Sequence, residues 1–451
     1  MTYDLLFRNT GYGDVAVKDG QIVCVGEAAE DAAQEIDAEG LWLLPGGIDV
    51  HTHLGLTVGR NSTCDGWELG SKAALAGGTT TVIEHISFDA EGSCRAALEL
   101  AFIQAGGRCC CDYSLHGVVQ KVDDELKETV TAAAVEGLPS WKAYTTYDSP
   151  ICGPELEELF RIAKAAGALV CVHCEDDDLL RNAKEQLVAA NHVGPEQHAA
   201  SRPAYCEARS VREVLAAAHR AGDAPVHIVH LSTAAGLREI RMARESGQQN
   251  ISVETCPQYL LLDESLYKRG TLRALRAIMS PPLRGADDRI ALWQGLQRGD
   301  IDMIATDHCA WAMAQKEQGW TDLRLVPNGA PGVEERLTLL LSVGVNRGLL
   351  SLERAVELLS TAPARRFGLE RKGRIAEGCD ADLVLFDPEA ESRFPTPPEH
   401  GGAEYSLYSD LELKGRVEKV WLRGSLVYAD GQVLAQPGQG RYVERYIRSD
   451  T

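Results

Sequence analysis

Hydrophobic and polar positions in the middle of the chain follow two alternating patterns. Between residues 46 and 372, short apolar runs typical of buried strands alternate with longer stretches that have helical spacing, such as 67–76, 155–166, 210–221 and 235–246. Eight strand candidates end near His53, Glu84, His116, Lys142, His173, His230, Glu254 and Asp307. Eight such units predict an α/β fold, a (β/α)8 TIM-like barrel. A doubly wound open sheet is disfavoured, because no Gly-x-Gly-x-x-Gly follows the first strand.

The two ends of the chain carry shorter, strand-like runs. They lie at residues 4–8, 14–18 and 21–25 near the N-terminus, and at 382–386, 417–422 and 425–428 near the C-terminus. Turns are expected at Asp19-Gly20, Asp387-Pro388 and Asp430-Gly431. Neither set is long enough to bury a core alone. We therefore expect residues 1–45 and 373–431 to pair into one smaller β-sandwich, with residues 432–451 as a C-terminal tail.

Composition and charge exclude several classes of partner. The 451 residues are 45% hydrophobic and 25% charged, without an apolar run that could span a bilayer, so no membrane partner is expected. A formal net charge of −21 argues against a nucleic-acid surface. The N-terminus lacks a basic stretch followed by an apolar one, and the 13 cysteines suit reduced thiols. A cytoplasmic protein is expected.

Histidines and one carboxylate close several of the strand candidates. His51 and His53 alternate along one strand end and therefore project from the same face. His173, His230 and Asp307 end three later strands, and barrel strands present their carboxyl ends at one face. Imidazole and carboxylate suit Zn²⁺ or a similar divalent ion. Four histidines exceed what one catalytic ion usually takes, so two ions are the better count.

Lys142 ends the fourth strand candidate, at the same face. An ammonium there would be repelled by two metal ions, so Lys142 would have to be neutral. A neutral amine can take up CO₂ as a carbamate, whose two oxygens can each reach one ion. The alternative is a lysine that forms a salt bridge or extends its ammonium to solvent.

Many ordered motifs resemble those of the cyclic amidases of the amidohydrolase superfamily, dihydropyrimidinase and D-hydantoinase, and most closely the bacterial phenylhydantoinase branch. The motifs, which cover nearly the whole chain, are Pro-Gly-Gly-Ile-Asp-Val-His-Thr-His (45–53), Ala-Gly-Gly-Thr-Thr-Thr (76–81), Lys142 with Tyr147, His-Ala-Ala-Ser-Arg-Pro (198–203), Ile-Val-His-Leu-Ser (228–232), Glu-Thr-Cys-Pro-Gln-Tyr-Leu (254–260), Ser-Pro-Pro-Leu-Arg (280–284), Ala-Thr-Asp-His-Cys (305–309) and Pro-Asn-Gly-Ala-Pro-Gly-Val-Glu (327–334).

The resemblance implies an enzyme that opens the cyclic amide bond of 5-substituted hydantoins or dihydropyrimidines to N-carbamoyl amino acids. It implies two divalent ions, Zn²⁺ or else Mn²⁺. The implied ligands are His51, His53 and Asp307 for one ion, His173 and His230 for the other, and a carbamate on Lys142 for both.

The same resemblance assigns roles to four residues. Asp307 would move a proton from the attacking water to the leaving ring nitrogen, and Tyr147 would donate to the developing oxyanion. Ser280 and Asn328 would bind the amide edge of a small cyclic amide or ureide through backbone groups, although both stretches also fit ordinary turns. A homotetramer is implied as well, with residues 438–446 as a contact.

One departure from the family and three alternatives stay open. The family usually has His-Ala-Glu-Asn where this chain has His173-Cys174-Glu175-Asp176, which changes the surroundings of a ligand. A dihydroorotase would carry an arginine at the position that Gly55 occupies here, which disfavours that alternative. Allantoinase and a non-catalytic scaffold remain, the latter disfavoured by the complete ligand set. Apolar residues in the loop 54–60 and at Ile151 predict an uncharged or aromatic ring substituent.

Overall fold

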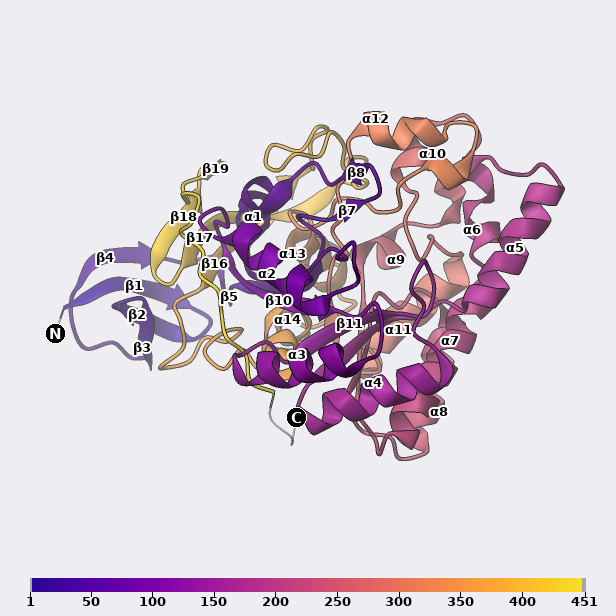
Figure 1. Cartoon of the computed structure of the whole chain (residues 1–451). Helices are drawn as coiled ribbons and strands as arrows, with labels where there is room; N and C mark the ends of the chain where they lie inside the picture. The colour runs from indigo at the N-terminus through magenta and orange to yellow at the C-terminus, as the bar shows by residue number, and fades with distance from the viewer. Residues whose placement is uncertain (1, 448–451) are drawn as a thin grey trace.

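Eight parallel strands form the centre of the protein, as the computed structural model shows for residues 2–447 (Figure 1). Their sheet order is β15-β14-β13-β12-β11-β10-β9-β6, so neighbours in sequence are neighbours in space. The strands are β6 (Gly47–Thr52), β9 (Thr79–His85), β10 (Asp112–Val118), β11 (Ser140–Tyr144), β12 (Leu169–His173), β13 (Val226–Ile228), β14 (Ile251–Thr255) and β15 (Met303–Ile304). The predicted (β/α)8 barrel is confirmed.

Helices surround the sheet and follow the strands in the expected order (Figure 1). They include α1 (Gly66–Ala76), α2 (Cys94–Ala105), α3 (Asp124–Val135), α4 (Gly153–Ala165), α5 (Asp177–Ala189), α7 (Ala204–Arg220), α8 (Ala234–Glu245) and α11 (Ala286–Arg298). Side chains cap several of them. At the start of α3, the Asp123 side chain accepts a hydrogen bond from the Leu126 amide at 3.0 Å. This amide lies in the first turn, whose N–H groups have no acceptor within the helix. None of the described helices is long and apolar enough to cross a membrane.

The first and last strands close the barrel through a short bridge and buried side chains. Thr52 pairs with His308, and the His53 amide donates to the His308 carbonyl at 2.7 Å. Arg336, which is fully buried, donates to the carbonyls of Ile48 at 2.9 Å and Ile304 at 2.8 Å. One guanidinium therefore replaces ladder bonds that the two-residue strand β15 is too short to make.

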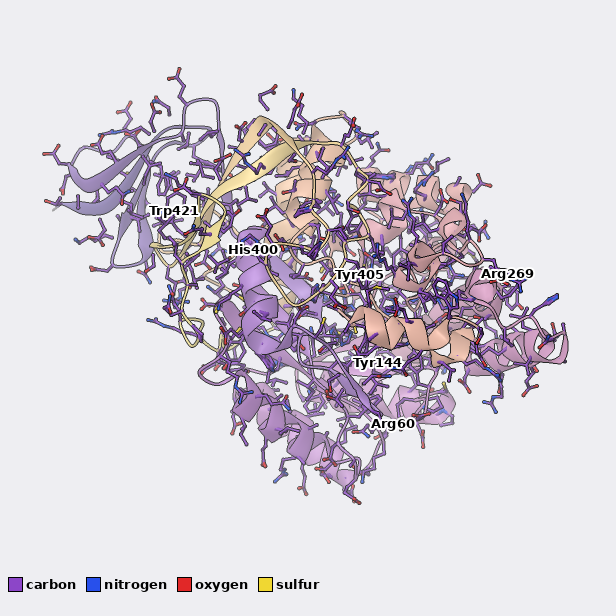
Figure 2. The ribbon with its side chains drawn as sticks, turned by 90° about the horizontal axis from the view of Figure 1, so that it is seen from above. Arg60, Tyr144, Arg269, His400, Tyr405 and Trp421 are labelled. Carbon is purple, nitrogen blue, oxygen red and sulfur yellow. The ribbon has the colours of Figure 1, made fainter. Side chains whose placement is uncertain are left out.

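A second unit contains two sheets built from both ends of the chain. The first has the order β3-β2-β1-β4, and the second β19-β18-β17-β16-β5. Their strands are β1 (Tyr3–Thr10), β2 (Gly13–Lys18), β3 (Gln21–Gly26), β4 (Ala32–Asp37), β5 (Trp42–Pro45), β16 (Leu383–Ser392), β17 (Leu413–Leu422), β18 (Ser425–Ala429) and β19 (Gln432–Val433). Trp421 lies where the two sheets meet (Figure 2). Phe7 packs edge-on against it at 4.9 Å between ring centres. The expected pairing of the chain ends into a β-sandwich is confirmed.

The structure differs from the sequence-based expectation at two strands. β4 was not predicted, because half of its side chains are polar and exposed and only Ile36 is buried, so it lacks the alternation of a buried strand. The expected turn at Asp387-Pro388 is wrong. β16 continues through it, and only its register against β17 shifts between Asp387 and Glu391. Proline cannot donate a ladder bond, which produces a bulge here and not a reversal.

The boundary between sandwich and barrel lies at Gly46, inside the first motif. β5 pairs with β16 of the sandwich, whereas β6 belongs to the barrel. A side chain at Gly46 would place its Cβ 2.1 Å from the Thr80 hydroxyl oxygen, so only glycine fits where the chain passes between the two units.

The segment after the sandwich runs along the base of the barrel. The Tyr113 amide donates to the Arg441 carbonyl at 2.9 Å, and the Val443 amide to the Tyr113 carbonyl at 2.8 Å. Arg445 is fully buried and donates to the hydroxyls of Ser114 and Ser140, each at 2.7 Å. The tail segment therefore packs within its own chain.

Lys372 joins the barrel to the sandwich through a buried group of carboxylates. Its ammonium lies 2.8 Å from Asp112 of β10, and 3.2 and 2.7 Å from Asp380 and Asp382, which precede β16. All four side chains are at most 8% exposed. Arg423 also contacts Asp112. The carboxylates are neutralised only because these cations are held among them.

We therefore expect Lys372→Met to destabilise the protein by about 3–5 kcal/mol, since three buried carboxylates would lose a shared counterion. The thermal midpoint should fall by roughly 4 °C or more, given the size of the chain. Lys18→Met is the matched control. Lys18 pairs with Asp4 at 2.7 Å at the surface, and its loss should shift the midpoint by about 1 °C at most. Equal shifts for the two variants in a thermal scan would contradict this role for Lys372.

Candidate metal centre

Three of the predicted ligands meet at the carboxyl ends of β6 and β15. Asp307 Oδ1 lies 3.2 Å from His51 Nε2 and 3.1 Å from His53 Nε2. Two ligand atoms that share a tetrahedral Zn²⁺ ion at about 2.0–2.1 Å each lie roughly 3.3 Å apart. Asp307 Oδ1 therefore has the spacing of a fellow ligand to each of the two histidines.

The remaining predicted ligands lie on the neighbouring strands. Lys142 Nζ is 3.4 Å from His51 Nε2, and Lys142 is 1% exposed. The rings of His173 and His230 are 4.6 Å apart between centres, and His230 is 5.3 Å from His51. The structure thus brings His51, His53, Lys142, His173, His230 and Asp307 together at one end of the barrel.

Ionisation in this cluster favours metal binding. Burial raises the pKa of Asp307, but His51 and His53 outweigh it and hold the pKa well below its usual range. Burial lowers the pKa of Lys142, only partly offset by Asp307 and Glu254. The pKa of His230 is also lowered far below normal by burial. A charged carboxylate, a neutral His230 imidazole and an amine inclined to lose its proton are forms that bind a cation. Burial lowers the pKa of His51, but the carboxylates Glu254 and Asp307 outweigh burial and raise that pKa, so a metal ion would have to displace a proton there.

Two buried carboxylates orient the histidines from behind. Glu254 at the end of β14 contacts His51 Nδ1 and accepts from His227 Nε2 at 3.0 Å. Glu175 accepts from His173 Nε2 at 2.8 Å. Each carboxylate occupies one ring nitrogen and leaves the other for a metal, namely Nε2 of His51 and Nδ1 of His173. Sequence reasoning did not give either glutamate a role, although Glu254 ends a predicted strand and Glu175 lies two residues after a predicted ligand.

His85 is a further histidine at this site that the sequence did not single out. Its nearest ring nitrogen lies within 4.8 Å of ligand atoms of His51 and His53. Both of its ring nitrogens are buried without a hydrogen-bond partner among residues 2–447, as are Nδ1 of His53 and Nδ1 of His230. Buried polar atoms are rarely left unpaired. This donor set, with its ligand-like spacing, fits divalent metal ions.

Three site residues have backbone conformations that are unusual for side chains other than glycine. Tyr147, His230 and Asp307 have φ values of 75°, 38° and 54°. Such left-handed conformations cost free energy and recur at functional sites, where they aim side chains that a regular strand end would not. The turn at the end of each strand therefore directs these three groups.

Tyr147 lies at the mouth of the site and is connected to the ligands through one arginine. Arg202 Nη2 donates to the Tyr147 hydroxyl at 3.3 Å, and its Nε donates to both oxygens of Glu175 at 3.1 Å. Because the Tyr147 oxygen accepts from Arg202, its own proton is directed elsewhere. Burial of the hydroxyl raises the pKa of Tyr147 to about 12, so the group is protonated at neutral pH and can donate.

The two predicted substrate-binding residues lie on adjacent segments. The Gly329 amide donates to the Ile278 carbonyl at 3.0 Å, which joins the segment of Asn328 to that of Ser280. The Asn328 carbonyl accepts from Trp311 Nε1 at 2.8 Å, while Ser280 is 8% exposed. Ser280 and Asn328 therefore lie on two joined segments.

The departure after His173 does not disturb that ligand. Cys174 is 2% exposed and packs in the core, and Asp176 accepts from the Leu179 amide at 2.9 Å as the cap of α5. Glu175, which the family motif shares, makes the contact with His173. The two residues that depart from the motif thus have structural roles away from the metal-binding nitrogen.

The expectation that Ile151 lines the pocket is wrong. Ile151 is 2% exposed and packs in the hydrophobic core, because its amide donates to the Tyr144 carbonyl and folds the loop inward. Aromatic rings lie nearer to the predicted ligands than Ile151 does. Tyr144 lies 5.6 Å from Phe88 and 5.7 Å from Tyr147, and Tyr147 lies 5.2 Å from His173. Val58, in the loop 54–60, is 57% exposed.

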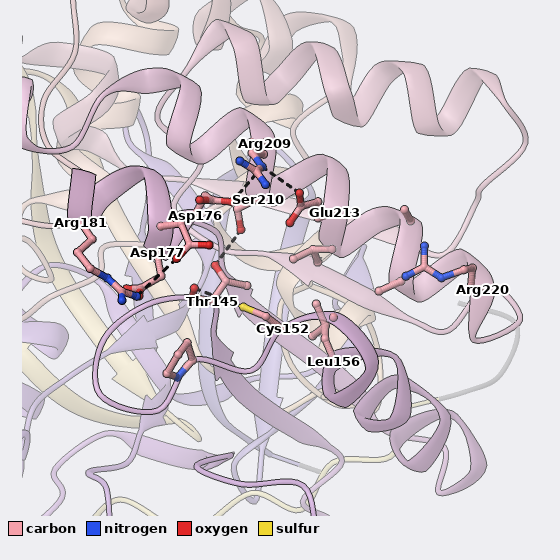
Figure 3. Close-up of a pocket in the computed structure, with 16 residues that line it drawn as sticks. Thr145, Cys152, Leu156, Asp176, Asp177, Arg181, Arg209, Ser210, Glu213 and Arg220 are labelled. Carbon is pink, nitrogen blue, oxygen red and sulfur yellow. Dashed lines mark hydrogen bonds and ion pairs between the residues drawn. The ribbon is translucent and has the colours of Figure 1, made fainter. Parts of the chain in front are cut away.

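A separate cavity of about 450 Å³ lies among helices α4, α5 and α7 (Figure 3). Thr145 and Ser210 line it, with their hydroxyls 2.8 Å apart, and none of the metal-site residues does. Its arginines are paired with carboxylates: Arg209 lies 3.1 Å from Asp176 and 3.0 Å from Glu213. Burial raises the pKa of Cys152, the thiol that lines this cavity, to about 11, so it is not an activated nucleophile.

Comparison with known proteins agrees with this geometry. The model of the Amidohydrolase family matches residues 42–427. A D-phenylhydantoinase of Escherichia coli O1:K1 / APEC is 41% identical over 416 residues, 91% of this chain and 89% of that protein.

Solved structures agree as well. D-hydantoinase from Bacillus sp. AR9 superposes with a TM-score of 0.95 at 33% identity over 99% of this chain and 100% of that one. Dihydropyrimidinase from Brevibacillus agri NCHU1002 superposes with a TM-score of 0.94 at 35% identity over 98% of both chains. The match of sequence along most of both chains, together with the histidine, lysine and aspartate cluster, establishes that this chain belongs to the amidohydrolase family.

Proposed function

We propose that the protein is a metal-dependent hydrolase that opens the cyclic amide bond of 5-substituted hydantoins or dihydropyrimidines to N-carbamoyl amino acids. One observation carries the proposal: four histidines and Asp307 converge around a buried Lys142, in a chain 41% identical to a D-phenylhydantoinase. A non-catalytic scaffold has no need to gather four histidines, a lysine and an aspartate at one end of its barrel.

The proposed cofactors are two divalent ions, Zn²⁺ with Mn²⁺ as the alternative. His51, His53 and Asp307 would hold one ion and His173 and His230 the other. Neutral Lys142 would bond through Nζ to the carbon of CO₂ and release one proton, and the resulting carbamate would supply one oxygen to each ion. When bound, such ions polarise a carbonyl and acidify the attacking water.

Asp307 and Tyr147 supply the proton transfer and the oxyanion contact in this proposal. The low pKa of Asp307 keeps it ionised, which is the form a base requires. In this proposal the carboxylate accepts a proton from the attacking water and returns it to the leaving ring nitrogen. Tyr147 donates to the oxygen on which charge develops, since Arg202 already occupies its acceptor side.

The substrate is proposed to be a small cyclic amide or ureide. Its amide edge would face backbone groups of Ser280 and Asn328, and its ring substituent would face Phe88, Tyr144 and Tyr147. An aromatic wall suits an uncharged or aryl substituent better than a carboxylate. The homotetramer and the cytoplasmic location stay predictions.

Ring opening of four substrates tests the proposed function. With one metal-loaded preparation, kcat/KM for a 5-aryl hydantoin should exceed that for dihydroorotate and at least equal that for dihydrouracil, because the wall beside His173 is aromatic. Efficient dihydroorotate turnover, or activity on allantoin alone, would overturn the substrate assignment. No turnover of any ring by a preparation that holds two ions per chain would favour the scaffold.

Tyr147→Phe tests the oxyanion contact. The variant keeps the ring and removes only the hydroxyl donor, so kcat on the best substrate should fall by about a hundredfold or more while the metal content stays unchanged. Tyr446→Phe is the matched control, since Tyr446 is 48% exposed on the tail and should leave kcat unaltered. A Tyr147→Phe enzyme within a few-fold of the wild type would remove Tyr147 from the mechanism.

A further inference from the structure

Lys316 is a buried cation that the proposed chemistry does not use. It lies at the end of the short helix α12 (Met313–Lys316) and is fully buried. No carboxylate of residues 2–447 pairs with it within 4.0 Å, unlike Lys372 at the base of the barrel. Burial lowers the pKa of Lys316 to about 7, while the three carbonyls to which it donates favour its protonated form. A buried ammonium without a counterion is expensive, so its partners must repay the lost hydration.

The partners of Lys316 are three backbone carbonyls on two segments. Its Nζ donates to the carbonyls of Ile278 at 2.7 Å, Pro327 at 2.9 Å and Gly329 at 2.5 Å. An ammonium has three N–H donors, so the three carbonyls use all of them. Ile278 lies two residues before Ser280, and Pro327 and Gly329 flank Asn328. One side chain therefore spans the two segments assigned to the substrate.

Other buried side chains hold the neighbouring carbonyls. His198 Nε2 donates to the Met279 carbonyl at 2.7 Å, and the Tyr259 hydroxyl to the Pro281 carbonyl at 2.8 Å. The two contacts lie on either side of Ser280. Each holds only the segment 278–281 and does not reach the segment 327–329. Within residues 2–447, Lys316 is the side chain whose hydrogen bonds join the segment 278–281 directly to the segment 327–329.

We propose that Lys316 is a positioning residue that fixes the distance between the Ser280 and Asn328 segments, and with it the slot that takes the amide edge of the substrate ring. The inference rests on the proposed function, because that function is what assigns a substrate to the two segments. Its contacts are all with carbonyls of the two segments and none is with the proposed metal ligands. Lys316 therefore acts on the binding of the ring and not on metal loading.

Lys316→Met tests this role, since methionine has a similar length and no donor. We expect KM for the best ring substrate to rise by about tenfold or more, the effect of one weakened hydrogen bond to the ring. We expect kcat to change by less than about threefold and the metal content per chain to stay at the wild-type value. Lys414→Met is the matched control, because Lys414 is exposed and pairs only at the surface with Glu389.

Three results would overturn the inference: an unchanged KM in a folded variant, a loss of metal, or a fall in kcat alone. A lower thermal midpoint with KM unchanged would assign Lys316 a purely structural role. If Lys316→Met does not accumulate as folded protein, KM and kcat of Lys316→Gln are measured instead. The glutamine amide keeps two donors, so we expect an intermediate KM. Failure of the proposed function is distinguishable, because the wild type itself would then open no ring.

Discussion

The burial of unpaired imidazole nitrogens at one end of the barrel is the constraint on which the rest of the site depends. His53, His85 and His230 each keep a ring nitrogen away from water with no partner in residues 2–447, and Asp307 places a charged oxygen among the histidines. Leaving such groups unpaired costs free energy that a folded protein rarely tolerates. Divalent cations would offset part of this cost by binding the imidazoles and the charged oxygen of Asp307, and the left-handed backbone at His230 and Asp307 holds two of these groups in place.

The two ends of the barrel have different roles. At the carboxyl ends of the strands, carboxylates such as Glu254 and Glu175 orient histidines. At the opposite end, Lys372 and Arg445 are buried among groups that they neutralise or hydrogen-bond, and these contacts connect the sandwich and the tail to the barrel. This division is typical of (β/α)8 enzymes, whose chemistry lies at one face and whose stability depends on the other.

The sequence predicted most of the fold, and it singled out six side chains that the structure brings together, because strand ends and short motifs are local signals. Strand ends and the spacing of His51 and His53 follow from periodicity alone. The sequence could not predict the groups whose role arises from distant contacts. Arg202 meets Tyr147 from a position 55 residues away, and Lys316 lies 38 residues from Ile278 in a short helix without a motif. β4 and the bulge at Pro388 were missed because polar edge strands and prolines resemble loops.

X-ray diffraction from crystals of the metal-loaded protein, recorded above and below the absorption edge of the bound metal, tests the central claim most directly. Our account predicts two anomalous peaks per chain, one between His51, His53 and Asp307 and the other beside His173 and His230. It also predicts density for a carboxyl group on Lys142 Nζ between them. A single peak, a peak elsewhere, or an unmodified Lys142 amine beside two fully occupied ions would contradict it.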